Sequence, residues 1–317
     1  MRSGAVGDFI FTLPVLGALR EANPAAHVEV MGHPEMLSLV AGRYYADGVS
    51  SIDRAEVATL FSRRAAVAPS LAERLARCDL VLAYLTDADG MLRSSLESVC
   101  RGRIEIFSPV LPGAPPSHIV DHLLTPLKCL GIPVSERTPR LRLLAEDRAA
   151  GERLLAERGV DCTRPLLAIH PGAGSAAKRW PAEQFARLID RVVERTAVVL
   201  VSGPADTEVT DEVLDLCEHR DEPVVLRDQP LLVVAQALGC CDAFAGNDSG
   251  ITHMAAALDV PTVAIYGETD PARWAPRGER VYVMRAPDRK MAAVSLEKVH
   301  AAVNAALSNS GARQESV

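Results

Sequence analysis

Hydrophobic positions in the second half of the chain follow two alternating patterns. Short runs of consecutive apolar residues are typical of strands that are buried on both faces of a sheet. Between these runs, apolar residues recur every three or four positions, as they do on one face of a helix. The helical spacing is clearest in residues 182–194, through Phe185, Leu188, Ile189, Val192 and Val193. The alternation predicts a parallel sheet covered by helices on both sides.

The same two patterns predict strands and helices along the whole chain. Expected strands of the second half are 166–170, 197–202, 223–226, 242–245, 261–266 and 281–284, and those of the first half are 27–31, 49–53, 79–85 and 104–107. Helical patterns lie near 8–22, 69–77, 89–99, 117–130, 146–158 and 294–307. We therefore expect an α/β protein with two Rossmann-like parallel-sheet domains, residues 1–155 and 156–290, followed by a helix and tail at 291–317.

The N-terminal domain departs from this pattern at its start. A strand is expected before the first glycine loop, which begins at Gly4, yet only Met1, Arg2 and Ser3 precede it. We interpret the first strand of this domain as truncated.

Length and composition exclude several classes of protein. The chain has 317 residues, which suits two domains of ordinary size, and 48% of them are hydrophobic. Its formal net charge of −7 gives no broad attraction to nucleic acid. The seven cysteines include no C-x-x-C pair, so they indicate neither zinc nor a disulfide framework, but small buried residues in a reducing compartment. No apolar stretch approaches the ~20 residues that span a bilayer. We expect a cytoplasmic protein with at most peripheral contact at the inner face of the membrane.

The first loop that carries a candidate functional residue is Gly4-Ala-Val-Gly7-Asp8. Asp8 stands where a helix would begin. Its carboxylate could cap the free N–H groups of that helix, or it could act as a general base presented from the loop. The motif alone does not separate the two roles.

A second loop, His170–Pro181, follows the first strand of the C-terminal domain. It fails as a Walker A loop, because Ala177 and Arg179 occupy positions that this motif reserves for glycine and for serine or threonine. It matches the relaxed dinucleotide pattern Gly172-x-Gly174-x-x-Ala177. However, the helix begins four residues later than that pattern requires, and the next strand carries no acid at its tip to hold a ribose.

The interpretation that we prefer for this loop is a looser phosphate site. Backbone N–H groups near Gly172 and Gly174 would approach an anion, and the ammonium group of Lys178 would add positive charge. The alternative is an exposed basic turn, with Trp180 packed over the start of the helix.

The third loop, Gly246-Asn-Asp248-Ser249-Gly250-Ile-Thr-His253, joins a strand to a helix. A helix N-terminus offers free N–H groups and about half a unit of positive charge. Asp248 or Ser249 can cap the helix, Gly250 leaves room for a phosphate, and His253 can donate a hydrogen bond. An ordinary capped helix with a half-buried histidine is the alternative.

Taken in order, these blocks resemble the ADP-heptose:lipopolysaccharide heptosyltransferases, glycosyltransferase family 9. The matching motifs are Gly7-Asp8-x-x-x-Thr12-Leu13-Pro14, His170-Pro-Gly-Ala-Gly with Lys178-Arg-Trp-Pro, Asn247-Asp-Ser-Gly-Ile-Thr-His253 and Pro261-Thr-Val-Ala-Ile-Tyr-Gly267. The resemblance implies a GT-B fold, with two domains facing each other across a cleft, and an inverting sugar transfer that needs neither metal nor cofactor. It implies ADP-heptose as donor and a lipopolysaccharide-core or other cell-surface glycan as acceptor.

The resemblance also assigns site residues. Asp8 corresponds to the catalytic base. The donor-diphosphate contacts correspond to Gly172, Ala173, Lys178, Asp248, Ser249, Gly250 and His253. Glu208 corresponds to the acid that contacts the sugar of the nucleotide; the alternative is a solvated residue on an acidic helix.

Three other functions remain open at this stage. The donor could be another nucleotide-sugar, because nothing in the loops identifies its base. The glycine pattern at Gly172 would also suit a dinucleotide-dependent oxidoreductase. A non-catalytic nucleotide-sugar-binding protein is the third alternative.

Overall fold

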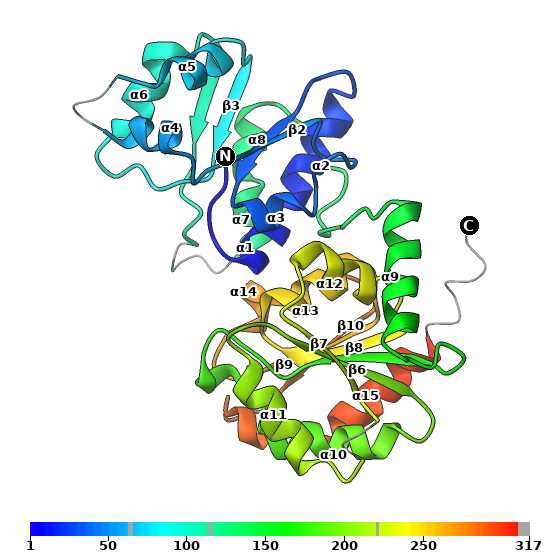
Figure 1. Ribbon diagram of the computed structural model, residues 1–317. Helices are drawn as coiled ribbons and strands as arrows, with labels where there is room; N and C mark the ends of the chain where they lie inside the picture. Colours follow the sequence, from blue (N-terminus) through cyan, green and yellow to red (C-terminus); the bar gives the residue numbers. More distant parts are fainter. Residues whose placement is uncertain (63–65, 112, 114–116, 220–221, 310–317) are drawn as a thin grey trace. The chain divides into compact units, whose positions relative to one another are not determined.

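Parallel strands joined by helices make up both parts of the chain (Figure 1). The structure, a computed structural model, describes residues 1–62, 66–111, 113, 117–219 and 222–309. It divides into two units, Met1–Arg137 and Thr138–Val317. The expected tail at 310–317 lies outside the described residues.

The first unit contains two pairs of parallel strands. Its elements are α1 (Val6–Ile10), α2 (Leu13–Ala22), β1 (Glu29–Gly32), α3 (Pro34–Leu37), β2 (Gly48–Ser51), α4 (Ala55–Ala58), η1 (Thr59–Phe61), α5 (Pro69–Leu75), β3 (Leu80–Ala83), α6 (Met91–Val99), β4 (Arg103–Ile106), α7 (Ile119–Leu123) and α8 (Thr125–Cys129). Strand β1 pairs with β2 and β3 with β4, both in parallel. Met1 and Arg2 lie between the two pairs, and Arg2 forms a parallel bridge with Tyr84.

The second unit is a six-stranded parallel sheet with helices on both faces. Its elements are α9 (Ala145–Glu157), β5 (Leu166–His170), η2 (Ala176–Lys178), α10 (Ala182–Val192), β6 (Ala197–Ser202), α11 (Thr207–Leu216), β7 (Val224–Arg227), α12 (Leu231–Leu238), β8 (Ala243–Asn247), α13 (Gly250–Ala257), β9 (Thr262–Tyr266), α14 (Pro271–Trp274), β10 (Val281–Arg285), η3 (Met291–Ala293) and α15 (Leu296–Ser308). Helices α10, α11 and α15 cover one face, and α12 and α13 cover the other (Figure 1).

The strand order of this sheet is β10-β9-β8-β5-β6-β7. Relative to the first strand, β5, the chain winds outward in one direction through β6 and β7, and in the other through β8, β9 and β10. The winding therefore reverses between β5 and β8, which is the place where doubly wound sheets bind ligands.

The strands of the second unit lie in its core, and burial on both faces explains their continuous apolar sequences. Strands β5, β6, β8 and β9 are buried along their whole length. Helix α10 turns its apolar stripe, which includes Phe185, Leu188 and Ile189, into the same core. Trp180 is fully buried beside Phe185, with the two rings nearly perpendicular, and its indole Nε1–H donates to the Val294 carbonyl at 3.0 Å.

The expected strands of both halves are confirmed, with ends that differ by up to two residues. The expected domain boundary differs more. The two units divide between Arg137 and Thr138, whereas the polar sequence of α9 suggested a boundary after residue 155. Helix α9 packs against α12 instead: the Gln236 amide donates to Asp147 at 3.0 Å, and Gly151 lies against the Gln236 carbonyl. The pattern of α9 could not show this, because its contact surface is built from small and polar residues.

Gly151 provides a test of this packing. A Cβ atom at this position would lie 2.2 Å from the Gln236 carbonyl oxygen. Helix propensity alone favours alanine over glycine by ~1 kcal/mol. We expect Gly151→Ala nevertheless to lower the free energy of unfolding by about 1–3 kcal/mol, because the added methyl group overpacks the helix contact.

Urea unfolding followed by tryptophan fluorescence measures this effect, because both tryptophans, Trp180 and Trp274, lie in the second unit. The exposed neighbour Glu152 provides the control: Glu152→Ala should change stability by no more than about 0.5 kcal/mol. Stabilisation by Gly151→Ala would show that α9 does not pack on α12 as described.

Candidate functional site

The loops after β5 and β8 meet at the carboxyl edge of the second sheet. Strands β5 and β8 are hydrogen-bonded neighbours, with His170 paired to Gly246 at their ends. The chain leaves β5 into the glycine loop 171–181, and it leaves β8 directly into α13. The two separate sequence motifs are thus brought together by the reversal in strand order.

Asn247 joins these two loops. Its side chain is fully buried. The amide Nδ2–H donates to the Pro171 carbonyl at 2.7 Å, while Oδ1 accepts the Trp180 backbone N–H at 2.9 Å. A single amide therefore holds the beginning and the end of the glycine loop against the last residue of β8.

Lys178 reaches from the glycine loop to the start of α13. Its Nζ donates to Asp248 Oδ2 at 2.7 Å, and the Nε2 of His253 lies 3.8 Å from Asp248 Oδ1. The side chain of Asp248 is only 8% exposed, while that of Lys178 is 41% exposed. Asp248 is thus the buried partner, and the ammonium group retains an open side that faces solvent.

The electrostatics of Asp248 follow from these contacts. Burial by itself would raise the pKa of this carboxyl. Hydrogen bonds from His253 and Lys178 outweigh burial, and they hold the pKa of Asp248 well below its usual range. The carboxylate is therefore ionised at neutral pH, and it holds Lys178 in place.

The start of α13 presents backbone donors beside this cluster. Ser249 is the N-cap: its Oγ accepts the Thr252 backbone N–H at 3.3 Å. Gly250 is the first helical residue. The hydroxyl of Thr252 donates back to the Asn247 carbonyl. The positive end of the helix dipole and the Lys178 ammonium therefore lie at the same edge of the sheet.

The glycine loop shows one position where glycine is required and one where it is not. A Cβ atom on Gly172 would lie 2.1 Å from Asp206 Oδ1, whereas a Cβ atom on Gly174 would meet nothing within 4 Å. Ala173, between them, is buried. Gly172 thus allows close approach of Asp206, while Gly174 is exposed and leaves the outer side of the loop open.

Asp206 supports the underside of this loop. Its Oδ2 accepts the Gly203 N–H at 3.2 Å and lies 4.0 Å from Nε2 of His170. His170 is buried, which lowers its pKa, and its Nδ1–H donates to the Val201 carbonyl at 2.9 Å. Sequence reasoning missed both Asp206 and Asn247 as site residues. A polar residue directly at the carboxyl end of a buried strand was the available signal for Asn247.

Glu208 lies in the first turn of α11, which begins shortly after β6 at the same edge of the sheet, and it is exposed. Its position is compatible with contact to a bound nucleotide and equally with a solvated acid.

Asp8 belongs to the first unit, where it is the third residue of α1. Its Oδ2 accepts the Ala5 N–H at 3.1 Å, and Oδ1 forms an ion pair of 3.2 Å with the guanidinium of buried Arg2. The N-cap is Ala5, so Asp8 supports the helix start from inside the first turn. Gly4 has a φ of +121°, and a Cβ atom there would lie 2.8 Å from Asp8 Oδ2. The carboxylate is held firmly, and its side chain is still 39% exposed.

Residues 114–303 match the model of the family described as glycosyltransferase family 9 (heptosyltransferase), over more than half of the chain. The chain belongs to glycosyltransferase family 9. A curated relative, lipopolysaccharide heptosyltransferase 2 of Salmonella typhimurium, is 33% identical over 147 residues, which cover 43% of this chain and 41% of that protein. The matched segment thus spans less than half the length of that relative.

Two solved structures share the fold over nearly the whole chain. The glycosyltransferase family 9 protein of Veillonella parvula has a TM-score of 0.82 at 22% identity, covering 97% of this chain and 96% of that one. The structure of E. coli ADP-heptose lps heptosyltransferase II has a TM-score of 0.79 at 20% identity, covering 98% and 100%. The expected fold class, α/β of GT-B type, is confirmed.

The family 9 chain contains one D-x-D sequence, Asp87-Ala-Asp89, a pattern that can hold a metal ion. Asp87 accepts the backbone N–H groups of Leu92 and Arg93, both at 3.0 Å, and Asp89 accepts that of Met91. These carboxylates therefore cap α6. Within the described residues, no three or more His, Cys, Asp or Glu side chains are grouped so that they could hold a metal ion. The described helices also include none that is long and apolar enough to cross a membrane.

The lowered pKa of Asp248 predicts how its contribution to stability depends on pH. Because the folded pKa lies below the unfolded one, the ionised carboxylate stabilises the fold above the unfolded value of about 3.9, and this contribution is lost as the pH falls further. We expect Asp248→Asn to lower the free energy of unfolding by roughly 1–2 kcal/mol at pH 7. The loss is modest because Lys178 is partly exposed, so solvent screens the ion pair. The difference in unfolding free energy between the variant and the parent protein should become smaller below about pH 4.

Urea unfolding followed by tryptophan fluorescence at several pH values between neutral and acid measures this difference. Glu212, an exposed acid on α11, provides the control: Glu212→Gln should stay close to the parent throughout. If the loss of unfolding free energy caused by Asp248→Asn stayed constant down to acid pH, this result would contradict the charged hydrogen bonds described for Asp248.

Proposed function

We propose that the protein is an inverting heptosyltransferase, which moves a heptose from ADP-heptose to a lipopolysaccharide-core or other cell-surface glycan. The observation that carries this proposal is the cationic cluster at the switch point of the second sheet, where Lys178 meets the N-terminus of α13. Family membership supports sugar transfer, and the likeness to the E. coli ADP-heptose lps heptosyltransferase II supports ADP-heptose as donor.

The donor diphosphate is proposed to bind at this edge. Backbone N–H groups of Ser249 and Gly250 and of the loop at Gly172 and Ala173 would donate to its oxygens. One N–H of the Lys178 ammonium is held by Asp248, so two remain for phosphate. His253 would donate through its ring, and Glu208 would accept a hydroxyl of the nucleotide sugar.

The same positive groups would assist the chemical step. The acceptor hydroxyl attacks the anomeric carbon, the bond from that carbon to the diphosphate oxygen breaks, and the bonding electrons leave with ADP. Developing negative charge on the diphosphate is stabilised by Lys178 and the helix terminus, which act in the place of a divalent metal. Attack from the face opposite the leaving group inverts the anomeric centre.

Asp8 is proposed as the general base that takes the proton of the acceptor hydroxyl. The ion pair with Arg2 and the hydrogen bond from the Ala5 N–H hold its carboxylate in place, and the side chain stays partly exposed, as a base requires. The acceptor would be a glycan precursor at the inner face of the cytoplasmic membrane, approached by a cytoplasmic enzyme.

The competing functions make different demands on the site. A nicotinamide dinucleotide enzyme needs an acid at the tip of β6 to hold a ribose, and β6 ends in Ser202 followed by Gly203. Titration with a nicotinamide cofactor should therefore give no fluorescence change. A binding protein without activity would bind ADP-heptose and release no ADP, whereas we expect release that depends on an acceptor.

Lys178→Ala tests the donor site. Loss of a charge-assisted contact to phosphate should cost roughly 1.5–3 kcal/mol, which weakens the affinity for ADP about 10- to 150-fold. Isothermal titration calorimetry measures this affinity. Equal affinity for ADP in the variant and the parent would show that Lys178 does not contact the diphosphate.

The matched control is Arg195→Ala. Arg195 lies in the connection from α10 to β6, at the opposite edge of the same sheet, and it is exposed. This variant removes an equal charge from the same unit, and its affinity for ADP should stay at the parent value. If both variants lost affinity equally, net charge rather than a specific contact would explain the effect.

Asp8→Asn tests the general base. The amide oxygen can still accept the Ala5 N–H, but it cannot take a proton, so turnover should fall on the order of 10²- to 10⁴-fold. Affinity for ADP should not change, because Asp8 does not contact the diphosphate in this scheme. Turnover is measured by release of ADP in the presence of acceptor.

Asp47→Asn is a close control for this substitution. Asp47 lies in the same unit, forms an ion pair with Arg20, accepts the Val28 N–H at 2.8 Å and is 43% exposed. Losing its charge disturbs the fold in the same way but should leave turnover near the parent value. Near-parent turnover of a folded Asp8→Asn protein would mean that Asp8 is not the base.

A further inference from the structure

Two consecutive basic residues lie near the end of the glycine loop, and their side chains reach opposite neighbours. The Nζ of Lys178 donates to Asp248 at 2.7 Å, at the start of α13, which follows β8. Arg179 reaches the other way, and its Nη2 donates to the Ala205 carbonyl at 3.4 Å, in the connection from β6 to α11. Strand β5 lies between β8 and β6 in the sheet. The two cations therefore lie on the two sides of the loop that leaves β5.

The guanidinium of Arg179 has little to compensate its charge. Its bond to Ala205 is longer than an ordinary N–H···O hydrogen bond. Its Nε–H is buried and donates to none of the residues that the structure describes, and the described residues offer it no ion pair either. Lys178, by contrast, is held by the Asp248 carboxylate. A half-buried guanidinium without an anionic partner is unfavourable, so this position favours a bound anion.

The charge of Arg179 also acts at the base of the loop. Burial is the main cause that lowers the pKa of His170, the last residue of β5, and Arg179 lowers it further. The Asp206 carboxylate acts in the opposite sense, but it already accepts the Gly203 N–H. The positive charge of Arg179 is therefore close to the carboxyl end of β5, where the switch point of the sheet lies.

Arg179 lies between two groups already proposed to bind the donor. The diphosphate is proposed to bind at the start of α13, beside Lys178, and Glu208 to accept a hydroxyl of the nucleotide sugar. Glu208 follows Ala205 by three residues and lies in the first turn of α11. The bond to Ala205 puts the Arg179 guanidinium on the α11 side of the Lys178 ammonium. In a nucleoside diphosphate, the group between the terminal phosphate and the ribose is the α-phosphate.

We propose that Arg179 binds the α-phosphate of the donor, while Lys178 binds the β-phosphate, which carries the sugar. The assignment rests on the proposed transfer from a nucleoside diphosphate sugar. The planar fork of a guanidinium can donate two parallel hydrogen bonds to the oxygens of one phosphate. Negative charge develops on the β-phosphate when its bond to the sugar breaks, whereas the α-phosphate keeps its charge. Arg179 therefore strengthens donor binding, and Lys178 also assists the chemical step.

Three ligands separate these contacts: ADP, AMP, which lacks the β-phosphate, and adenosine, which lacks both phosphates. Isothermal titration calorimetry measures the affinity for ADP, and competition against ADP measures the affinities for AMP and adenosine. We expect Arg179→Gln to weaken binding of ADP and of AMP by the same factor, about 10- to 100-fold, because both ligands contain the α-phosphate. Lys178→Ala should weaken ADP binding but leave AMP binding near the parent value. Neither substitution should change the affinity for adenosine.

Arg164→Gln is the matched control. Arg164 is half-buried in the same unit, and its guanidinium donates to the carbonyls of Val193 and Thr196 at the amino-terminal edge of the sheet. The variant therefore loses the same charge and comparable hydrogen bonds to backbone carbonyls, and its affinity for ADP should equal that of the parent. Urea unfolding followed by tryptophan fluorescence shows whether each variant is folded.

Other results contradict the assignment in identifiable ways. Unchanged ADP affinity in Arg179→Gln would mean that Arg179 does not contact the donor. Weaker ADP binding with unchanged AMP binding would assign the contact to the β-phosphate, and weaker adenosine binding would assign it to the nucleoside. Equal losses in Arg179→Gln and Arg164→Gln would indicate a general effect of charge or folding. If the parent protein bound no ADP, the proposed function would fail and the assignment with it, whereas the preceding results would leave that function intact.

Discussion

The second unit depends on one buried amide, that of Asn247. Its hydrogen bonds to Pro171 and Trp180 hold the glycine loop against the end of β8. A parallel sheet by itself does not fix the relation of the loops after β5 and β8, since each is attached to its own strand; this amide fixes it in the core, and the partly exposed Lys178–Asp248 pair adds a second link. Trp180, bound from one side by Asn247 and from the other by Val294, transmits the constraint into the core. The site is therefore rigid at its base and open at its surface.

The charges of the site follow the same division, with buried acids at its base and an exposed ammonium group at its surface. Asp248 is buried and ionised, so it must be compensated, and Lys178 and His253 surround it. A carboxylate close to a proposed phosphate site would be unfavourable if it were exposed. Buried behind Lys178, it directs the ammonium group outward instead. Asp206 has a similar supporting position beneath Gly172. Both acids shape a site whose outer side is composed of N–H donors and one ammonium group.

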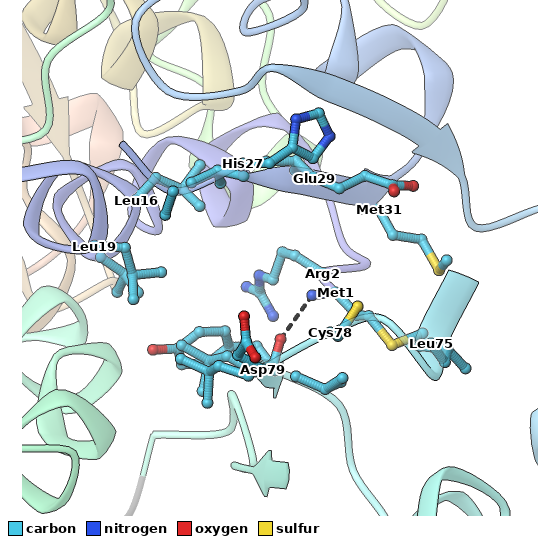
Figure 2. Close-up of a pocket in the computed structure, with 18 of the residues that line it drawn as sticks. Met1, Arg2, Leu16, Leu19, His27, Glu29, Met31, Leu75, Cys78 and Asp79 are labelled. Carbon is cyan, nitrogen blue, oxygen red and sulfur yellow. Dashed lines mark hydrogen bonds between the residues drawn. The ribbon is translucent and has the colours of Figure 1, made fainter. Parts of the chain in front are cut away.

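The first unit has two separate pairs of parallel strands, and Met1 and Arg2 connect them (Figure 2). Met1 and Arg2 are the only described residues that form the expected strand pairing between β1 and β3. The same two residues lead into Gly4 and Asp8, and the Arg2 guanidinium pairs with the Asp8 carboxylate. The proposed catalytic loop is therefore anchored to β1 and β3 through Arg2.

The sequence by itself determined the class of fold, the strands and the loops that carry polar chemistry. Continuous apolar runs such as 166–170 and 197–202 report burial on both faces, and the amphipathic stripe of α10 reports its packing, because these depend on local spacing alone. The family motifs also lie within single loops. Tertiary structure decided what spacing does not encode: that Asn247 and Asp206 support the site, that α9 packs on α12 through Gly151, and that Asp8 supports its helix from the third position. Each of these depends on partners between 3 and 89 residues away in the chain, whose approach is set by strand order and by backbone contacts rather than by local pattern.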